Sequence, residues 1–317
     1  MPIPRHAPRP RHARHALCRV SAVGLLLASL LLAAACQPTP QPDDDHLTPD
    51  ALDPPAEVPS YNELVERYNA NVAELDQVWA TAVVQARWLD ERGRRQFEQG
   101  SGHFIYQRPH RVALTVGQLG QTALWAGANE HHYWLLNVRE REGTLGRHAN
   151  VGRPCSESLG LPVNPRMVPH LMGLLPLPHA AAADDAPRVE LERGHYVIDP
   201  PGTGLRLWLH PRSARPTRIE MLDVAGEAGL VARLYSYERV RMDRLDRDQR
   251  PRIATHVNFY VMHDDVDADN PDLIVELDVV TDGRGRRGEV RDEAFDLDLL
   301  LRVHRLDSVR DLDEDCD

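Results

Sequence analysis

Cys36 is the residue in this chain best placed for covalent chemistry, because its thiol could be acylated. It follows Ala35 at the end of an apolar run, residues 22–35, and the first twenty residues hold five arginines and no acid. A basic stretch, a short apolar core and small residues at a cleavage point define a secretory signal. The run is too short to span a bilayer as a helix, which takes about 20 residues. We therefore expect residues 1–35 to be removed and Cys36 to become the first residue of the exported chain.

The residues before Cys36 also suggest what happens to its thiol. Residues 32–36 (LAAAC) resemble the lipobox of bacterial lipoproteins, with Ala33 where that family prefers Leu. A signal peptide followed by a chance cysteine is the alternative, but the chain has four cysteines and one falls at the required position. The resemblance implies a membrane anchor of acyl chains, each buried CH₂ contributing about 0.8 kcal/mol. Gln37 stands where enteric lipoproteins kept on the inner membrane have Asp. This implies the cell envelope, on the outer membrane facing the periplasm.

The charge of the mature chain excludes one class of partner. Removing residues 1–35 takes away five arginines and no acid, so the formal charge changes from −11 to −16. Nucleic acids are bound by basic stripes that neutralise phosphates, so we expect no nucleic-acid partner. Charge does not attract such a chain to anionic lipid headgroups either. The expected contact with a membrane is the acyl anchor on Cys36.

Residues 265–276 weakly resemble a calcium-binding loop. Asp265, Asp267 and Asp269 alternate, and Glu276 stands at the twelfth position, which is the spacing of oxygen ligands in such loops. The flanking segments are strand-like rather than helical, and the sixth position holds Asn instead of Gly. A solvated hairpin loop is therefore the alternative.

The local motifs of common enzymes and cofactor sites do not occur in the sequence. It contains no HExxH, no GxSxG, no zinc-type Cys/His spacing and no phosphate-binding glycine loop. His131 and His132 are adjacent, so in a strand they point to opposite faces. We expect no cofactor and no enzymatic activity. A secreted hydrolase with a triad assembled from distant residues stays open as an alternative.

Cys155 and Cys316 remain in the mature chain and could form a disulfide. The exported compartment is oxidising, and closing so long a loop is worth about 4–5 kcal/mol in the entropy model. Cys316 lies in an acidic tail, residues 305–317, and nothing in the sequence fixes the distance between the two thiols. Two free cysteines are the alternative.

The folded part is expected to begin with a helix. Residues 36–59 are rich in Pro and Asp and indicate an extended tether behind the lipidated Cys36. Ser60 and Glu63 fit a capping box, and apolar residues recur at three- and four-residue steps over residues 61–77. This spacing predicts an amphipathic helix whose apolar stripe packs on the rest of residues 60–304.

Period-two patterns then predict about eleven strands. They cover residues 81–89, 101–107, 110–117, 122–127, 131–138, 188–199, 203–210, 214–223, 229–242, 252–263 and 272–282. A short helix is predicted at 165–175, and residues 294–304 fit a helix or a strand. Strands without βαβ alternation indicate an α+β fold, a large curved antiparallel sheet with helices on its concave face.

This order of elements resembles the LolA/LolB-like superfamily of periplasmic lipoprotein carriers and receptors, which includes lipid-binding lipoproteins of the LppX type. Residues 102–112 (GHFIYQRPHRV) look like the family's strand-turn-strand segment, and residues 124–129 and 133–135 look like its next hairpin. The resemblance covers residues 60–280 in outline. It implies an unclosed half-barrel whose concave, apolar side holds acyl chains. No exposed apolar loop residue of the LolB type is identifiable, so a dedicated sorting role is not implied.

The residues expected to line such a cavity come from the first helix and from the tryptophans. They are Leu64, Tyr68, Val72, Leu75, Trp79, Trp88, Trp125, Trp134 and Trp208. Ordinary core packing is the alternative for each, because large aromatic side chains dominate protein cores.

The sequence thus favours an anchored, non-enzymatic domain that handles lipid or lipoprotein, with acyl chains or another lipoprotein as its partner. Two other classes stay open, a structural or envelope-stress interaction lipoprotein with a filled core and the secreted hydrolase.

The anchor can be tested at the N-terminus of the exported protein. We expect mass spectrometry of the purified chain to find Cys36 as its first residue, with acyl chains on the cysteine. An exported chain that begins at another residue, or at an unmodified Cys36, would contradict the lipobox interpretation.

Overall fold

The computed structural model describes residues 57–89, 95–118, 120–151, 163–182, 185–223, 225–262, 273–283 and 289–316. The chain divides into residues 1–44 and residues 45–317, and every described residue belongs to the second unit. The signal segment, Cys36 and most of the tether lie outside the described residues.

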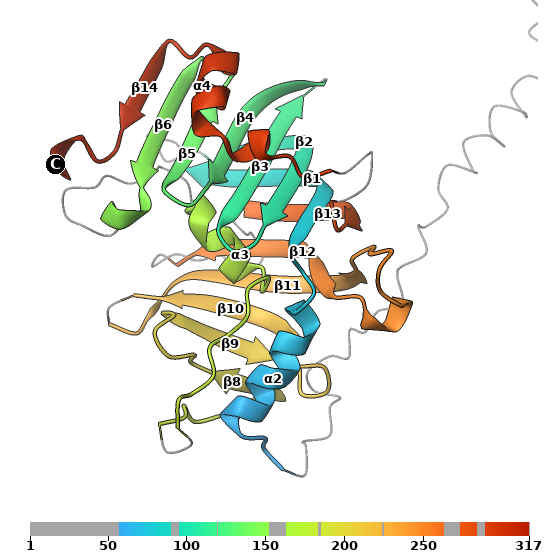
Figure 1. The fold of residues 1–317 in the computed structure, drawn as a ribbon. Coiled ribbons are helices and arrows are strands. Elements are labelled where there is room, and N and C mark those ends of the chain that lie inside the picture. Colours follow the sequence, from blue (N-terminus) through green and yellow to red (C-terminus); the bar gives the residue numbers. More distant parts are fainter. Residues whose placement is uncertain are drawn as a thin grey trace, which may run out of the picture. The chain divides into compact units, whose positions relative to one another are not determined.

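The described chain is built on one sheet of fourteen strands (Figure 1). Its first half holds β1 (Gln77–Leu89), β2 (Arg95–Gln107), β3 (Arg111–Gln118), β4 (Gln121–Ala128), β5 (His132–Asn137) and β6 (Glu142–Arg147). Its second half holds β7 (Glu190–Glu192), β8 (His195–Ile198), β9 (Leu205–Leu209), β10 (Pro216–Leu222), β11 (Ala228–Arg239), β12 (Arg252–Val261) and β13 (Leu273–Thr281), and β14 (Ser308–Asp311) follows near the C-terminus.

The strand order is β14-β6-β5-β4-β3-β2-β1-β13-β12-β11-β10-β9-β8-β7. The two sequence halves join where β1 pairs with β13, with Val84 opposite Val275. All neighbours are antiparallel except β14 and β6. β7 and β14 are the edges of the sheet, which is therefore open. The predicted α+β class, with a large, curved and unclosed antiparallel sheet, is confirmed.

The predicted number of strands was too low, for three local reasons. Residues 188–199 form two strands because Arg193 and Gly194 have positive φ and turn the chain back. β6 has few apolar residues because Gly143 and Gly146 stand where apolar side chains would mark a strand. A Cβ at Gly146 would come within 2.5 Å of the Tyr133 ring. β14 lies in the segment predicted as an acidic tail, where Leu312 is buried and its amide donates to the carbonyl of Leu145.

The first helix, α2 (Tyr61–Val72), begins with the predicted capping box. The amide of Ser60 donates to Oε2 of Glu63 at 2.8 Å, and the hydroxyl of Ser60 accepts from the amide of Glu63. The hydrogen bonds that the amide and the hydroxyl of Ser60 donate to the Glu63 carboxylate hold the pKa of Glu63 below its usual value. The predicted C-terminus at residue 77 was wrong, because Arg108 donates to the carbonyl of Val72 at 2.6 Å and the chain turns there to enter β1.

The two faces of the sheet carry different cores. On what we call the inner face, alternate side chains such as Phe104 and Leu207 form the main core, and α2 and α3 (Val168–Leu171) pack there. On the outer face, Trp134 and Leu136 form a second core.

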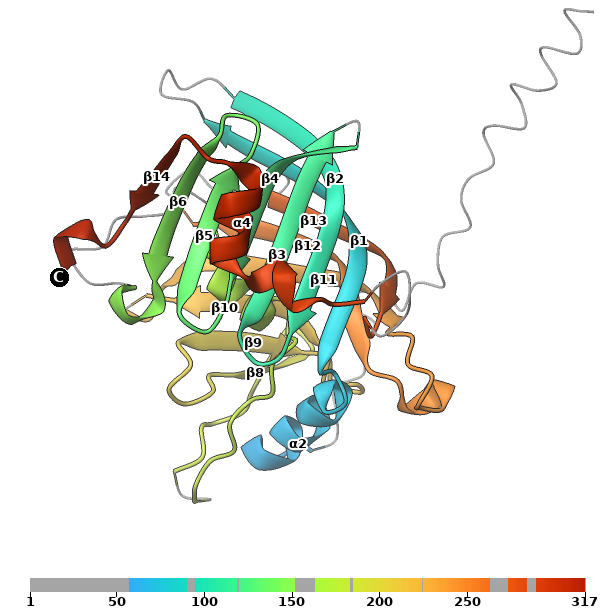
Figure 2. The ribbon, with the colours of Figure 1, turned by 45° about the horizontal axis from the view of Figure 1, so that its top comes forward.

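The third helix, α4 (Leu297–His304), packs on this second core and crosses β4 and β5 (Figure 2). Residues 294–304, which fit either element, are thus helical from residue 297, and Asp296 caps the helix by accepting from the amide of Leu299. The expectation that helices cover the concave face holds for α2 and α3. It was wrong for α4, because Trp134 and Leu136 give the outer face an apolar patch of its own. No helix in the described part of the chain is long and apolar enough to cross a membrane.

The capping box gives a stability prediction. Ser60→Ala removes the oxygen that accepts from the amide of Glu63, and we expect it to lower the free energy of unfolding by about 1 kcal/mol. Urea denaturation measures this change. Ser101→Ala, an exposed serine on β2, is the control and should change it by less than about 0.5 kcal/mol. Equal effects of the two substitutions would contradict the role of the cap.

Candidate functional site

An apolar pocket of about 280 Å³ lies on the inner face of the sheet. Its walls come from β1 to β4, from β12 and β13, and from the segment between β6 and β7. The apolar side chains that line it include Val84, Phe104, Val112, Leu114, Val116, Leu124, Val168, Met172, Phe259, Leu273 and Val275. Pockets for small ligands usually have volumes of about 300–1,000 Å³. This one suits a single slender apolar group.

The pocket exists because the inner face is short of side-chain volume at this place. Gly100, Ala86 and Ala126 occupy inward positions beside larger residues and help to line the pocket. Leu114 and Val116 also point inward, yet both are only partly buried. A strand whose inward leucine and valine keep some exposure faces a hollow rather than a filled core.

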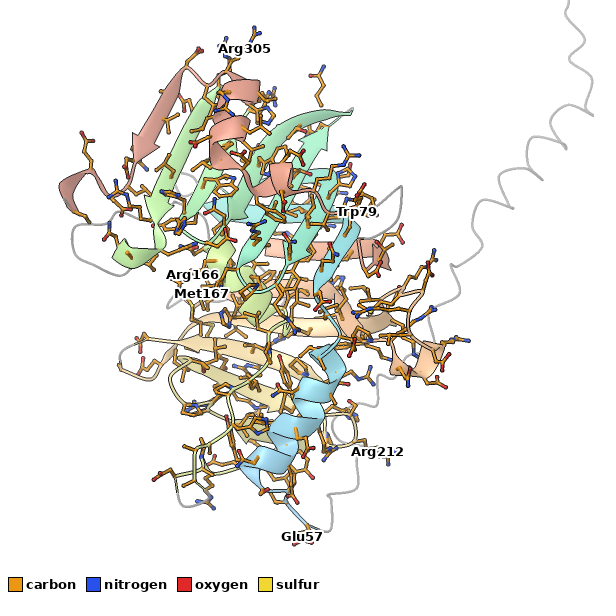
Figure 3. The ribbon with its side chains drawn as sticks, viewed as in Figure 1. Glu57, Trp79, Arg166, Met167, Arg212 and Arg305 are labelled. Atoms are coloured by element: carbon orange, nitrogen blue, oxygen red, sulfur yellow. The ribbon has the colours of Figure 1, made fainter. Side chains whose placement is uncertain are left out.

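Residues 163–172, which we call the insert, form one side of the pocket. The 3₁₀ turn of the insert (Pro165–Met167) is capped by Asn164, whose side chain accepts from the amide of Arg166 at 3.0 Å. Arg166 and Met167 lie between the two halves of the sheet (Figure 3). The turn leads directly into α3, and Pro165, Val168 and Met172 reach the pocket. This part of the wall is a short insert rather than a strand of the sheet.

Burial lowers the pKa of two histidines on or beside this insert. For His148, the hydrogen bond with the carbonyl of Asn129 partly opposes the effect of burial, and the charge of Arg166 adds to it. His148 Nε2 lies 2.7 Å from the carbonyl oxygen of Asn129. Burial, followed by the charges of Arg166 and His110, also lowers the pKa of His170 on α3. His170 is on the same helix as Val168, which lines the pocket.

A second hollow, of about 500 Å³, lies beyond the C-terminal end of α2. The described residues that line it are Asp76, Gln77, Gln107, Arg108 and Pro109. The guanidinium of Arg108 is already bonded to the carbonyls of Val72 and Ala73. This hollow offers little to enclose a ligand.

The helix residues predicted to line a cavity lie in the main core. Leu64, Tyr68, Val72 and Leu75 are all buried there, and the hydroxyl of Tyr68 donates to the carbonyl of Leu175 at 3.1 Å. None of the four lines the 280 Å³ pocket. They pack α2 against the rest of the chain.

The described tryptophans do not line the pocket either. Trp125 and Trp134 belong to the outer-face core under α4. Trp79 lies beside the ring of His103 at 4.9 Å, and Trp208 lies under the guanidinium of Arg218 at 4.5 Å. The side chain of Trp88 lies outside the description. The alternating pattern of residues 110–117 included Val112, Leu114 and Val116, which line the pocket. Such a pattern does not reveal which inward positions face a hollow.

Most of the residues predicted to bind calcium or to form a disulfide lie outside the described residues. Asp265, Asp267 and Asp269 are among the undescribed residues, and Oε1 of Glu276 lies 3.3 Å from Nδ1 of His256. Within the described ranges, no three His, Cys, Asp or Glu side chains gather as ligands for a metal. Cys316 is disulfide-bonded, while Cys155 is undescribed and its pairing stays a prediction.

No protein-family model matches this sequence, and no curated protein matches it. Solved structures with similar folds exist. A LolA superfamily protein from Nitrosomonas europaea is 10% identical with a TM-score of 0.42, and the match covers 76% of this chain and 99% of that one. A DUF1329 family protein from Desulfovibrio piger is 10% identical with a TM-score of 0.46, over 76% and 97% of the two chains.

A third similar structure is an outer membrane lipoprotein-sorting protein domain from Vibrio parahaemolyticus, described as putative in that role. It is 12% identical with a TM-score of 0.41, and the match covers 74% of this chain and 95% of that domain. At such identities these similarities concern the arrangement of strands and helices and not the chemistry of a site.

The buried histidines predict how stability depends on pH. A histidine whose pKa is lower in the folded than in the unfolded chain stabilises the fold fully above its unfolded pKa of about 6.5, and this contribution is lost as the pH falls. We therefore expect the melting temperature to drop between about pH 7 and pH 5. His170→Gln should reduce this drop.

The exposed His179→Gln controls for the change of residue type and should leave the drop as in the unchanged protein. Thermal unfolding followed by circular dichroism at each pH measures the effect. If His170→Gln leaves the drop in melting temperature unaltered, the pKa of His170 is not lowered by folding.

Proposed function

We propose that this protein is a lipid-anchored protein of the cell envelope that binds one acyl chain in the pocket on the inner face of its sheet. The observation that carries the proposal is the apolar lining of the pocket, to which β3 contributes Leu114 and Val116 and the insert contributes Met172. Such a lining gains free energy from hydrocarbon at about 25 cal/mol per Å² of buried apolar surface. The sequence around Cys36 supports the anchoring part of the proposal.

The residues of the pocket support binding rather than catalysis. The described residues that line it include no Ser, Thr, Cys, His or Lys, and its charged residues are Glu98, Arg139 and Glu140. Covalent catalysis needs a nucleophile within hydrogen-bond reach of a base, and this lining offers no such pair. A carrier or receptor for acyl chains needs only the apolar wall.

The expected affinity follows from the size of the hydrocarbon. About ten buried methylenes contribute about 8 kcal/mol, and association costs at least about 4 kcal/mol. Chain burial alone therefore gives a dissociation constant near 1 mM. Tighter binding requires polar contacts at the mouth, so the polar end of the ligand contributes to selection.

The pocket can be tested by filling it. We expect Leu114→Trp to weaken binding of a fluorescent hexadecanoyl probe at least about tenfold, because the indole occupies the space of the chain. Every variant is made in the full chain carrying Cys36→Ser, because this substitution removes the protein's own acyl chains from the assay. Fluorescence titration gives the dissociation constant, and circular dichroism confirms that the variant is folded.

Ile105→Trp is the matched control, because Ile105 alternates with the inward Phe104 and lies on the outer face of β2. It should change the dissociation constant less than about twofold. If the folded Leu114→Trp variant binds the probe with an unchanged dissociation constant, the acyl chain binds elsewhere and the proposal is contradicted.

A further inference from the structure

The charged side chains of the pocket are gathered at its mouth. β2 and β4 begin at the end of the sheet where β3 and β5 finish, since the four strands are antiparallel neighbours. Glu98 lies near the start of β2, and Arg139 and Glu140 follow β5 directly. The apolar lining continues along the strands from there, with Leu114 and Phe104 further in. An amphiphile whose chain lies in the pocket can therefore have its polar end beside Arg139 and Glu140, which are adjacent in the turn after β5.

The turn after β5 presents one of these charges in a fixed setting. The side chain of Asn137 donates to Oε2 of Glu140 at 3.0 Å, and Oδ1 of Asn137 accepts from the amide of Glu140 at 3.1 Å. These two hydrogen bonds close the turn that carries Arg139. The amide of Arg139 also donates to the carbonyl of Ala123 at 3.3 Å, which ties the turn to β4.

Two of the three charged groups are free to bind a ligand. Neither the guanidinium of Arg139 nor the carboxylate of Glu98 makes a hydrogen bond or ion pair with another residue in the described part of the chain. Both side chains are exposed. The third, Glu140, has its second carboxylate oxygen left for a ligand. The mouth thus offers one cation and two anions.

We propose that the ligand is a single-chain zwitterionic phospholipid. Its phosphate pairs with Arg139, and its ammonium group pairs with Glu140. This inference rests on the proposed function, because it takes the acyl chain to be in the pocket. The small volume admits one chain, and the mixed charges match a phosphoethanolamine headgroup, in which an anion and a cation are covalently linked.

Ligands of other charge fit the mouth less well. An anionic headgroup can pair with Arg139, but it also meets the carboxylate of the neighbouring Glu140, and like charges repel. A fatty acid has no cation for Glu140. Glu98 stands three strands away from β5, about 14 Å along the sheet at about 4.8 Å per strand. It is beyond the screening length of about 8 Å, so its effect on the ammonium is the weaker one.

The test compares three ligands that share a sixteen-carbon chain: a lysophosphatidylethanolamine, a lysophosphatidylglycerol and uncharged hexadecanol. The full chain carrying Cys36→Ser should bind the lysophosphatidylethanolamine about tenfold more tightly than the lysophosphatidylglycerol. Arg139→Gln should weaken both phospholipids about tenfold and change hexadecanol less than about twofold. Glu140→Gln should bring the two phospholipids to within about twofold of each other.

Arg302→Gln and Glu293→Gln are the matched controls, because both residues are exposed and neither lines the pocket. They should leave all three affinities unchanged. Equal affinity for the two phospholipids in the unchanged pocket would overturn the headgroup inference while leaving acyl binding intact. Failure of all three ligands to bind would overturn the proposed function as well.

Discussion

The structure depends on the alternation of side chains along β1 to β5. A strand sends successive side chains to opposite faces, so each of these strands must supply two different packing surfaces. The inner face meets the second half of the sheet, α2 and the insert, and the outer face meets α4. Where inner positions hold Ala126 or Gly100, opposing surfaces do not fill the space between them, and the pocket remains. The same alternation therefore builds both cores and leaves the hollow.

The helices differ in what they do for this arrangement. α2 is a packing element, since its apolar residues are buried in the main core and Arg108 holds its C-terminus. α4 seals the outer face, where Trp134 would otherwise be exposed. Among the described helices only α3 lines the pocket, through Val168, and it is flanked by Pro165 and Met172, which also line it. His170 places a titratable group on this helix.

Much of the fold could be predicted from the sequence, because period-two patterns mark strands wherever one face is buried. The pattern failed at β6, where Gly143 and Gly146 replace apolar residues so that Leu306 and Tyr133 can pack against the backbone. It failed at residues 188–199, since a tight turn at Gly194 leaves no break in the pattern. The pocket was less predictable than the fold. A strand pattern shows which side chains point inward, whereas a hollow depends on the volumes of all the residues that meet there.

The central claim is that the pocket holds an acyl chain. Native mass spectrometry of the full chain carrying Cys36→Ser, incubated with single-chain lipid, tests it most directly, because the protein's own acyl chains are then absent. The account predicts a non-covalent adduct with the mass of one single-chain lipid, retained by the Ile105→Trp variant and absent from the Leu114→Trp variant. The absence of an adduct from this chain after incubation with single-chain lipid, or an adduct that survives when the pocket is filled, would contradict it.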